Sequence, residues 1–292
     1  MPTNWRAWEW HPTRRSRQAK RGEAALRIIS LNAWGGKIHP PLIDYLAGAK
    51  ADILCLQEVT RSVGVTSGWL EYRDGSHILP QRANLFDEVK AVLPEHDGIF
   101  APASRGELLD GETAVPSEFG LATFVHRSLA ISGQAMDFVH GAFSPDGYGA
   151  HPRPRNAQVL RLFDYASGRP LVVAQLHGLR DMAGKGDTPA RLAQAEALIA
   201  LIGRIRKQDE PLVVCGDFNV LPDSATFEIL RQLGLTELVT SGGFAGTRTS
   251  LYPKDGRFAD YMLVSPGVSV ARFEVVREPE VSDHCALLLD IA

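Results

Sequence analysis

The feature that most limits the possible folds is a series of ten short apolar segments that follow one another from residue 25 to the end of the chain. Each is rich in aliphatic residues and is bounded by Gly, Pro, Asp or another charged residue, as strands are. Several are apolar at nearly every position, which is typical of strands buried on both faces. The segments are residues 25–32, 51–57, 119–126, 129–139, 157–166, 170–178, 210–218, 258–265, 268–276 and 285–291.

Four stretches between these segments have the period of an amphipathic helix instead. They lie at residues 40–50, 83–93, 188–206 and 223–233, and the last begins with two residues that favour a helix N-cap, Asp223 and Ser224. Strands buried on both faces, with helices between them, predict an α/β (α+β) fold: a four-layer αββα sandwich of two mixed β-sheets flanked by helices. The segments on either side of Gly168 are expected to pair as a hairpin. Residues 60–82, 103–118 and 140–156 are expected to be loops that contact the substrate.

The N-terminal segment differs in composition from the rest of the chain. Residues 1–21 hold six Lys and Arg residues and one acid, together with Trp5, Trp8 and Trp10. We therefore predict a basic, Trp-containing extension at residues 1–24 and a single domain at residues 25–292. The extension is either an arm for nucleic acid or a membrane surface, or a terminal segment with no binding role.

Charge and cysteine content argue against several classes of protein. The formal net charge is −3, so the chain that follows the basic extension is acidic. This disfavours a broad basic face for duplex nucleic acid, because such binding rests on Lys and Arg that neutralise phosphates. Cys55, Cys215 and Cys285 each lie in an apolar segment, so we expect reduced core residues and a cytoplasmic (intracellular) protein. No segment has the character of a membrane span or of a signal peptide, so we expect no integral membrane association.

Polar residues stand at the ends of the apolar segments, where a rigid sheet directs side chains into one cleft. Cleavage of a phosphate ester needs a metal ion, a positioned base and donors for the non-bridging oxygens, and carboxylates suit Mg²⁺. The polar residues at the segment ends supply such a set. They are Asn32, Glu58, His177, Asp217, Asn219, Asp260, Asp283 and His284.

Taken singly, these residues also have structural explanations. Glu58 fits a salt bridge, and Asp260 has Arg257 and Arg272 as alternative partners. The histidines fit satisfied core positions, and Asn32 fits a turn. A structural explanation must account for the whole ordered set at once, which weakens it.

The motifs SLNAW, LQEV, GDFN, ADYMLV and SDH, with the strand-end His177 between LQEV and GDFN, resemble the endonuclease/exonuclease/phosphatase superfamily. This superfamily includes exonuclease III-like and deoxyribonuclease I-like enzymes, inositol-polyphosphate phosphatases, deadenylases and neutral sphingomyelinases. The resemblance covers residues 26–292, and its strength lies in the order of all the motifs. It implies a single catalytic domain that binds Mg²⁺, with Mn²⁺ as a substitute.

The resemblance implies a role for each matching residue. Glu58 is the principal metal ligand, supported by Asn32, and Asp283 reaches the metal directly or through water. Asn32 also lies where it contacts the substrate. Asp217 orients or deprotonates the attacking water, and Asn219 holds that water or a phosphate oxygen.

The histidines complete the implied site. His284 donates to the scissile phosphate, while Asp260 fixes its ring and favours the imidazolium form. His177 contacts a phosphate oxygen from the opposite side of the cleft. Its neighbours depart from the family pattern, because Gln175 and Leu176 precede it where many relatives have Asn and Thr or Ser.

Many relatives supply a Tyr or an Arg from the segment that precedes the hairpin. Arg155 is our candidate for this substrate-binding position, with Arg153 and Tyr148 as alternatives.

The resulting expectation is magnesium-dependent hydrolysis of a phosphoester by a water that Asp217 orients. A phosphodiester, with nucleic acid first, is the expected substrate. A phosphatase or phospholipase-type activity on a small-molecule or lipid phosphate is the alternative, and an inactive binding scaffold is a third reading. We expect no obligate protein partner.

Overall fold

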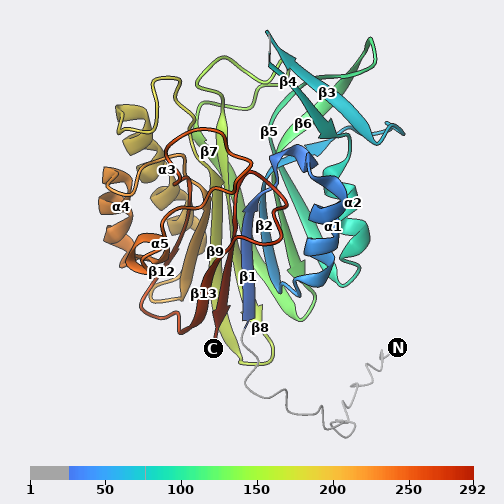
Figure 1. Ribbon diagram of the computed structural model, residues 1–292. Helices are drawn as coiled ribbons and strands as arrows, with labels where there is room; N and C mark the ends of the chain where they lie inside the picture. Colours follow the sequence, from blue (N-terminus) through green and yellow to red (C-terminus); the bar gives the residue numbers. More distant parts are fainter. Residues whose placement is uncertain (1–25, 76) are drawn as a thin grey trace, which may run out of the picture.

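The protein folds as two facing β-sheets with helices on their outer faces (Figure 1). The structure is a computed structural model and describes residues 26–75 and 77–292. The predicted extension at residues 1–24 lies outside the described residues. The four-layer αββα sandwich expected from the apolar segments is confirmed.

One sheet has eight strands and the other has six, and both are mixed. In each sheet a single parallel pair, β1 with β2 and β9 with β10, lies among antiparallel pairs. The larger sheet has the order β13 (Val270–Val276), β14 (Ala286–Ile291), β1 (Leu26–Asn32), β2 (Ile53–Arg61), β6 (Thr113–His126), β5 (His96–Asp110), β3 (Trp69–Asp74) and β4 (His77–Arg82). The smaller sheet has the order β11 (Thr236–Glu237), β12 (Asp260–Val264), β10 (Leu212–Asp217), β9 (Arg169–His177), β8 (Arg155–Asp164) and β7 (Leu129–His140).

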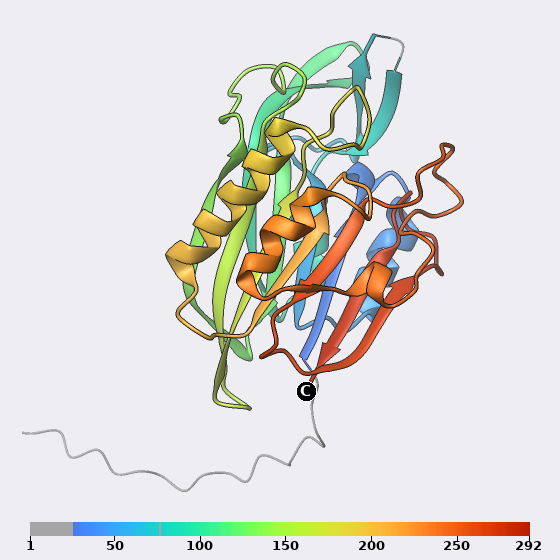
Figure 2. The same ribbon diagram turned by 90° about the vertical axis from the view of Figure 1, so that its left-hand side faces the viewer.

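The four predicted helical patterns all form helices. Helices α1 (His39–Gly48) and α2 (Leu85–Val92) cover the eight-stranded sheet, and α3 (Pro189–Ile205) and α4 (Ala225–Leu230) cover the six-stranded sheet (Figures 1 and 2). Ser224 is the N-cap of α4, as predicted, and Thr188 caps α3. Short elements complete the chain: η1 (Trp34–Gly36), η2 (Arg231–Leu233) and α5 (Leu238–Ser241). Among the described residues, no helix is long and apolar enough to span a membrane.

Alternation along the strands divides the apolar residues between two cores. In β1, Ile28 packs between the sheets, whereas its neighbour Ile29 packs against α1 and α2. Because both faces of β1 are buried, its sequence is apolar throughout. All three cysteines are buried and free, in agreement with the expectation.

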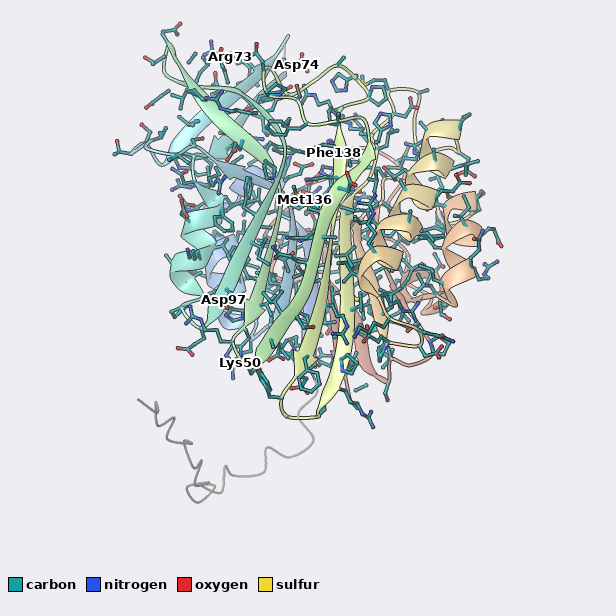
Figure 3. All side chains as sticks on the ribbon, turned by 180° about the vertical axis from the view of Figure 1, so that it is seen from behind. Lys50, Arg73, Asp74, Asp97, Met136 and Phe138 are labelled. Atoms are coloured by element: carbon teal, nitrogen blue, oxygen red, sulfur yellow. The ribbon has the colours of Figure 1, made fainter. Side chains whose placement is uncertain are left out.

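Two of the three expected loops are strands, so that prediction was wrong. Residues 60–82 contain the β3–β4 hairpin, and residues 103–118 form the outer half of the β5–β6 hairpin, which stays in register to Asp110 and Thr113. Their many polar residues suggested loops, but cross-strand hydrogen bonds satisfy the backbone without a continuous apolar run. The β3–β4 tip, marked by Arg73 and Asp74, lies at the opposite end of the molecule from Lys50 and Asp97 (Figure 3). On the six-stranded sheet, Met136 and Phe138 mark the edge strand β7.

Candidate active site

Three neighbouring strands of the six-stranded sheet bring His177, Asp217 and Asp260 side by side. Asp217 is the last residue of β10, and it pairs in register with His177 on β9 and with Asp260 on β12. Residues in register on adjacent strands have side chains on the same face of a sheet. All three are buried, at one end of the sandwich.

The eight-stranded sheet contributes Asn32 and Glu58 from its parallel pair, β1 and β2. The pairing of β2 with β6 shifts register between Leu56 and Val59, and Glu58 has a left-handed backbone with φ of 55°. Such bulges redirect a side chain next to a functional site. The Glu58 side chain keeps 23% exposure, so an ion can reach it.

Asn32 connects the two sheets at the centre of the site. Its Nδ2 donates to Glu58 Oε1 at 3.1 Å and to Asp217 Oδ2 at 3.0 Å, and its Oδ1 accepts from the backbone N–H of Trp34 at 3.0 Å. Because carboxylates only accept, the amide nitrogen must face them. The amide oxygen is therefore engaged by the backbone, which favours a positioning role over metal ligation.

Asp217 and Asn219 form a tight turn after β10. Asp217 Oδ1 accepts from the backbone N–H of Asn219 at 3.0 Å, and Asn219 has φ of 54°. Gly216, with φ of 137°, precedes them, and a Cβ there would lie 2.1 Å from the backbone oxygen of Leu176. Only glycine fits there, so the GDFN motif is fixed by backbone packing as well as by chemistry.

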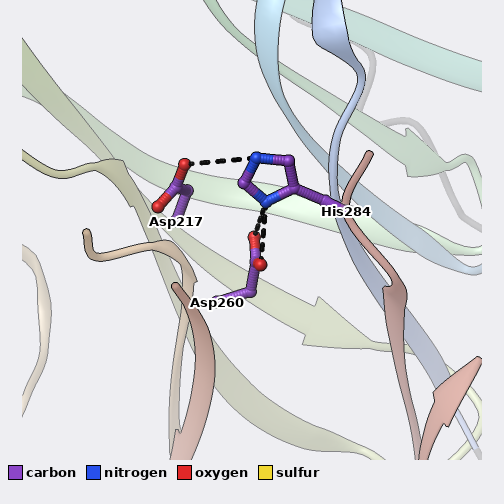
Figure 4. A group of neighbouring side chains, drawn as sticks. All are labelled: Asp217, Asp260 and His284. Carbon is purple, nitrogen blue, oxygen red and sulfur yellow. Dashed lines mark hydrogen bonds and ion pairs between the residues drawn. The ribbon is translucent and has the colours of Figure 1, made fainter. Parts of the chain in front are cut away.

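His284 binds Asp260 and faces Asp217 (Figure 4). Its Nδ1 lies 2.9 and 2.8 Å from the two carboxylate oxygens of Asp260, and its Nε2 lies 3.7 Å from Asp217 Oδ2. The suggested alternatives Arg257 and Arg272 instead bind backbone oxygens and Glu274, respectively. Asp260 therefore orients the ring so that Nε2 points into the site.

Burial changes the protonation of this pair. It lowers the pKa of His284 to about 4 and raises the pKa of Asp260 to about 7. The charge of Arg248 adds to the decrease in the pKa of His284, because it disfavours the imidazolium, but it opposes the increase in the pKa of Asp260, because it favours the carboxylate. The expectation that the pairing favours the imidazolium was therefore wrong for this structure, because burial outweighs the attraction of the carboxylate.

His177 lies on the other side of Asp217. Its Nε2 is 3.8 Å from Glu58 Oε1 and 3.8 Å from Asp217 Oδ2. Both distances exceed a hydrogen bond and leave room for a bridging atom. Burial, followed by the charge of Arg155, lowers the pKa of His177 well below its usual range, so the ring is neutral.

The unusual neighbours of His177 have a structural reason. Gln175 accepts from Gln57 Nε2 at 2.9 Å and donates to the backbone oxygen of Ala122 at 2.9 Å, which forms a polar link between the sheets below the site. Gly178 faces the backbone of Phe218, whose oxygen would lie 2.2 Å from a Cβ. Gln175 and Gly178 are therefore explained by packing between the sheets and against Phe218.

Of the three substrate-binding candidates, Arg155 is the one that lies close enough to the carboxylates of the site to feel their charges. Its Nε donates to the backbone oxygen of Gly178 at 2.9 Å, and the charges of Glu58 and Asp217 act on it, although burial lowers its pKa to about 10. Arg153 and Tyr148 pack on the two hairpins instead. The Arg153 guanidinium lies over the ring of Tyr72, and the Tyr148 ring contacts Gly106.

Sequence reasoning missed Arg248, which lies between α5 and β12. Its Nη1 donates to Asp283 Oδ2 at 2.7 Å, and its backbone forms a bridge with His284. No period or motif marks residues 244–259, and only the pairing of this segment with residues 282–285 brings the arginine into the site. Within the described residues, Arg248 Nε and Asp283 Oδ1 are buried without a hydrogen-bond partner.

The carboxylates fit a cation. Burial, followed by the charge of Asp283, raises the pKa of Glu58 to about 7, so a neighbouring carboxylate acts on Glu58 in addition to burial. The unpartnered Oδ1 of Asp283 offers a further oxygen, and oxygen ligands suit Mg²⁺. Asp217, Asp260 and His284 also have ligand atoms within 4.8 Å of one another. Asp260, however, already binds His284 through both oxygens, so Glu58 and Asp283 are the better candidates.

The chain resembles known proteins in sequence and in fold. The family model described as "Endonuclease/Exonuclease/phosphatase family" matches residues 29–284. No curated protein matches the chain.

Among solved structures, an endonuclease/exonuclease/phosphatase from Bacteroides vulgatus is 21% identical with a TM-score of 0.63, over 92% of this chain and 99% of that one. A mannosyl-6-phosphatase from Bacteroides thetaiotaomicron is 19% identical with a TM-score of 0.64, over 92% and 100%. The human Nocturnin catalytic domain is 19% identical with a TM-score of 0.60, over 92% and 94%. These identities establish a shared fold, and the family match extends from β1 to His284 at the site. The chain therefore belongs to the endonuclease/exonuclease/phosphatase family.

Proposed function

We propose that this chain hydrolyses a phosphoester with a divalent cation, Mg²⁺ first and Mn²⁺ as a substitute. The observation that carries the proposal is the position of the Asp217 carboxylate. It receives hydrogen bonds from Asn32 and from the backbone of Asn219, and both imidazoles face its Oδ2, at 3.8 and 3.7 Å. A carboxylate held between two neutral imidazoles is suited to bind and deprotonate a water.

Glu58 and Asp283 would hold the cation. When bound, the cation polarises a phosphate oxygen and offsets the charge that develops on it. The Arg248–Asp283 pair presents one unsatisfied N–H and one unsatisfied oxygen within the described residues. This combination suits a cation bound next to an anionic phosphate.

The residues around Asp217 have complementary roles in the proposed reaction. The water oxygen attacks phosphorus, the bond to the leaving oxygen breaks, and Asp217 takes the proton of the water. Asn219 holds this water or a phosphate oxygen. Arg155, on β8, and His177, on β9, contact phosphate oxygens from their side of the site.

His284 donates to the phosphate from the other side. Its Nδ1 faces Asp260, so a neutral ring with its proton on Nδ1 has no donor on Nε2. One further proton on the pair, whether on Asp260 or on the ring, leaves Nε2 as an N–H donor. Because burial raises the pKa of Asp260 to about 7, this additional proton is available near neutral pH.

We infer a phosphodiester as the first substrate class, as expected from the sequence. A phosphomonoester is the second, because one structural relative is named a mannosyl-6-phosphatase. The test is hydrolysis of a generic phosphodiester, of single- and double-stranded DNA and RNA, and of phosphomonoesters, each with Mg²⁺, Mn²⁺ or chelator. Turnover that chelator abolishes supports the proposal and selects the substrate class. Turnover that survives complete removal of metal contradicts it.

A further inference from the structure

Arg248 and Asp283 form a buried ion pair at the edge of the carboxylate cluster. The guanidinium Nη1 lies 2.7 Å from Asp283 Oδ2, and Arg248 is 7% exposed. A buried pair keeps a fixed geometry because neither partner can be replaced by solvent at low cost.

The guanidinium is itself held in place. It lies 4.3 Å from the centre of the Tyr252 ring, and the Arg248 backbone is bridged to His284. The residues on either side of Arg248 add contacts to the start of β12 and to the segment that precedes His284. Thr247 Oγ1 accepts from the backbone N–H of Asp260 at 3.1 Å, and Thr249 Oγ1 donates to the backbone oxygen of Ser282 at 2.7 Å.

Asp283 needs such a partner because its carboxylate lies among others. Burial and, next to it, the charge of Asp283 raise the pKa of Glu58, so the two carboxylates repel each other when no cation is bound. Arg248 binds one oxygen of Asp283 and leaves Oδ1 buried without a hydrogen-bond partner among the described residues. His284 Nε2 lies 3.8 Å from Oδ1, beyond hydrogen-bonding distance, so this oxygen is available to a cation.

We propose that Arg248 is a positioning residue that fixes the Asp283 carboxylate, so that Oδ1 and Glu58 together form the divalent-cation site. This inference rests on the proposed function, since it assigns a partner to one of the proposed metal ligands. It predicts that Arg248 acts on metal affinity. The loss should appear first in metal affinity, because partners of metal ligands influence binding through orientation. The charge of Arg248 also acts on the pKa values of His284 and Asp260, so turnover of each variant is compared at its own pH optimum.

The test is direct titration of the full chain with Mn²⁺ by calorimetry, with the melting temperature in chelator as a measure of folding. Arg248→Met removes the charge and keeps the side-chain stem, and should weaken Mn²⁺ binding about 10- to 100-fold. At saturating Mn²⁺ and at its own pH optimum, the variant's kcat should return close to the wild-type value. Arg248→Lys keeps the charge and should restore most of the affinity.

Arg27→Met is the matched control, because it removes an Arg–Asp pair of 2.8 Å to Asp290 at the other end of β1. It should leave the Mn²⁺ affinity unchanged even where it lowers the melting temperature. A folded Arg248→Met with wild-type or tighter Mn²⁺ binding would overturn the inference while leaving the proposed function intact. If Arg248→Met does not fold, Arg248→Gln takes its place with the same two outcomes. A wild-type chain that binds neither Mn²⁺ nor Mg²⁺ would contradict the proposed function itself.

Discussion

Asn32 and Asp217 are joined by a hydrogen bond of 3.0 Å that links the end of β1 in one sheet to the end of β10 in the other. The same amide also binds Glu58. One side chain thus sets the spacing between a proposed metal ligand and the proposed base. The geometry of the site depends on how the two sheets pack, and this explains why residues far apart in the sequence act together.

Asn32→Ala should therefore destabilise the fold and slow turnover together. Loss of both donated hydrogen bonds leaves the buried carboxylate of Asp217 and the partly buried carboxylate of Glu58 each short of a donor, and should lower the free energy of unfolding by about 1–3 kcal/mol. Asn32→Asp should be worse at pH 8, because an acceptor then faces two acceptors. Denaturant unfolding and kcat measure both effects.

Asn84→Ala is the control for the Asn32 variants. The Asn84 side chain also accepts a hydrogen bond from a backbone N–H, that of Ser62 at 2.8 Å, and it donates one to the backbone oxygen of Val65. It lies outside the carboxylate cluster. It should lower stability without a matching loss of kcat. Equal loss of kcat in both alanine variants would show that Asn32 has no special place in the site.

Metal affinity should increase with pH through about 7. Burial raises the pKa of Glu58 to about 7 in the metal-free protein, so protons compete with the cation below that pH. The apparent Kd for Mn²⁺ should therefore increase as pH falls from 8 to 6. At the acid end of this range the increase should approach about tenfold per pH unit. Calorimetric titration at several pH values measures this.

The same group affects the stability of the metal-free chain. Its pKa is raised on folding, so the fold favours the protonated form, and this contribution is present at acid pH and lost as pH rises through about 7. Glu58→Gln in chelator should raise the melting temperature at pH 8 and change it little at pH 4. A larger gain at pH 4 than at pH 8 would contradict the assigned direction of the shift.

The Asp260–His284 pair should act on the chemical step. His284→Ala and Asp260→Asn should each lower kcat by about 10²- to 10⁴-fold, which is typical of general acid–base groups. The double variant should be little worse than either single one, because the two residues act as a unit. Single-turnover kinetics at saturating Mn²⁺ isolate this step.

Mn²⁺ affinity separates a role in the chemical step from metal ligation. His284→Ala and Asp260→Asn should each keep the wild-type affinity for Mn²⁺, whereas Glu58→Gln should lose it. Loss of Mn²⁺ binding in His284→Ala to the same extent as in Glu58→Gln would place the cation at Asp217, Asp260 and His284 instead. His126→Ala, which removes a histidine that contacts Ser128 far from the site, is the control.

The sequence predicted those parts of the fold that rest on periodicity. Apolar runs such as residues 26–32 fixed the strands, and the polar residues at strand ends indicated the site because parallel and in-register strands end together. The β3–β4 hairpin was not predictable in this way. Its partly exposed strands contain Pro80 and several charges, and they are held by pairing with each other and, through Glu71 and Leu109, with β5.

Arg248 shows the second limit of the sequence. Its segment has no period, and its role arises only from contact with Asp283, which lies 35 residues further along the chain. The protonation of His284 shows a third. The sequence identified Asp260 as its partner, but burial, which depends on the whole packing of the site, determines that its pKa decreases.

The most direct test of the proposed function is the turnover of Asp217→Asn on whichever phosphoester the wild-type chain cleaves with Mg²⁺ or Mn²⁺. The substitution keeps the shape of the side chain but removes the charge that accepts the proton of the water. With Asp209→Asn as an exposed control, we predict that Asp217→Asn keeps the melting temperature and substrate binding but loses about 10²- to 10⁴-fold in kcat. Wild-type turnover by a folded Asp217→Asn would show that Asp217 is not the base and would contradict the proposed mechanism.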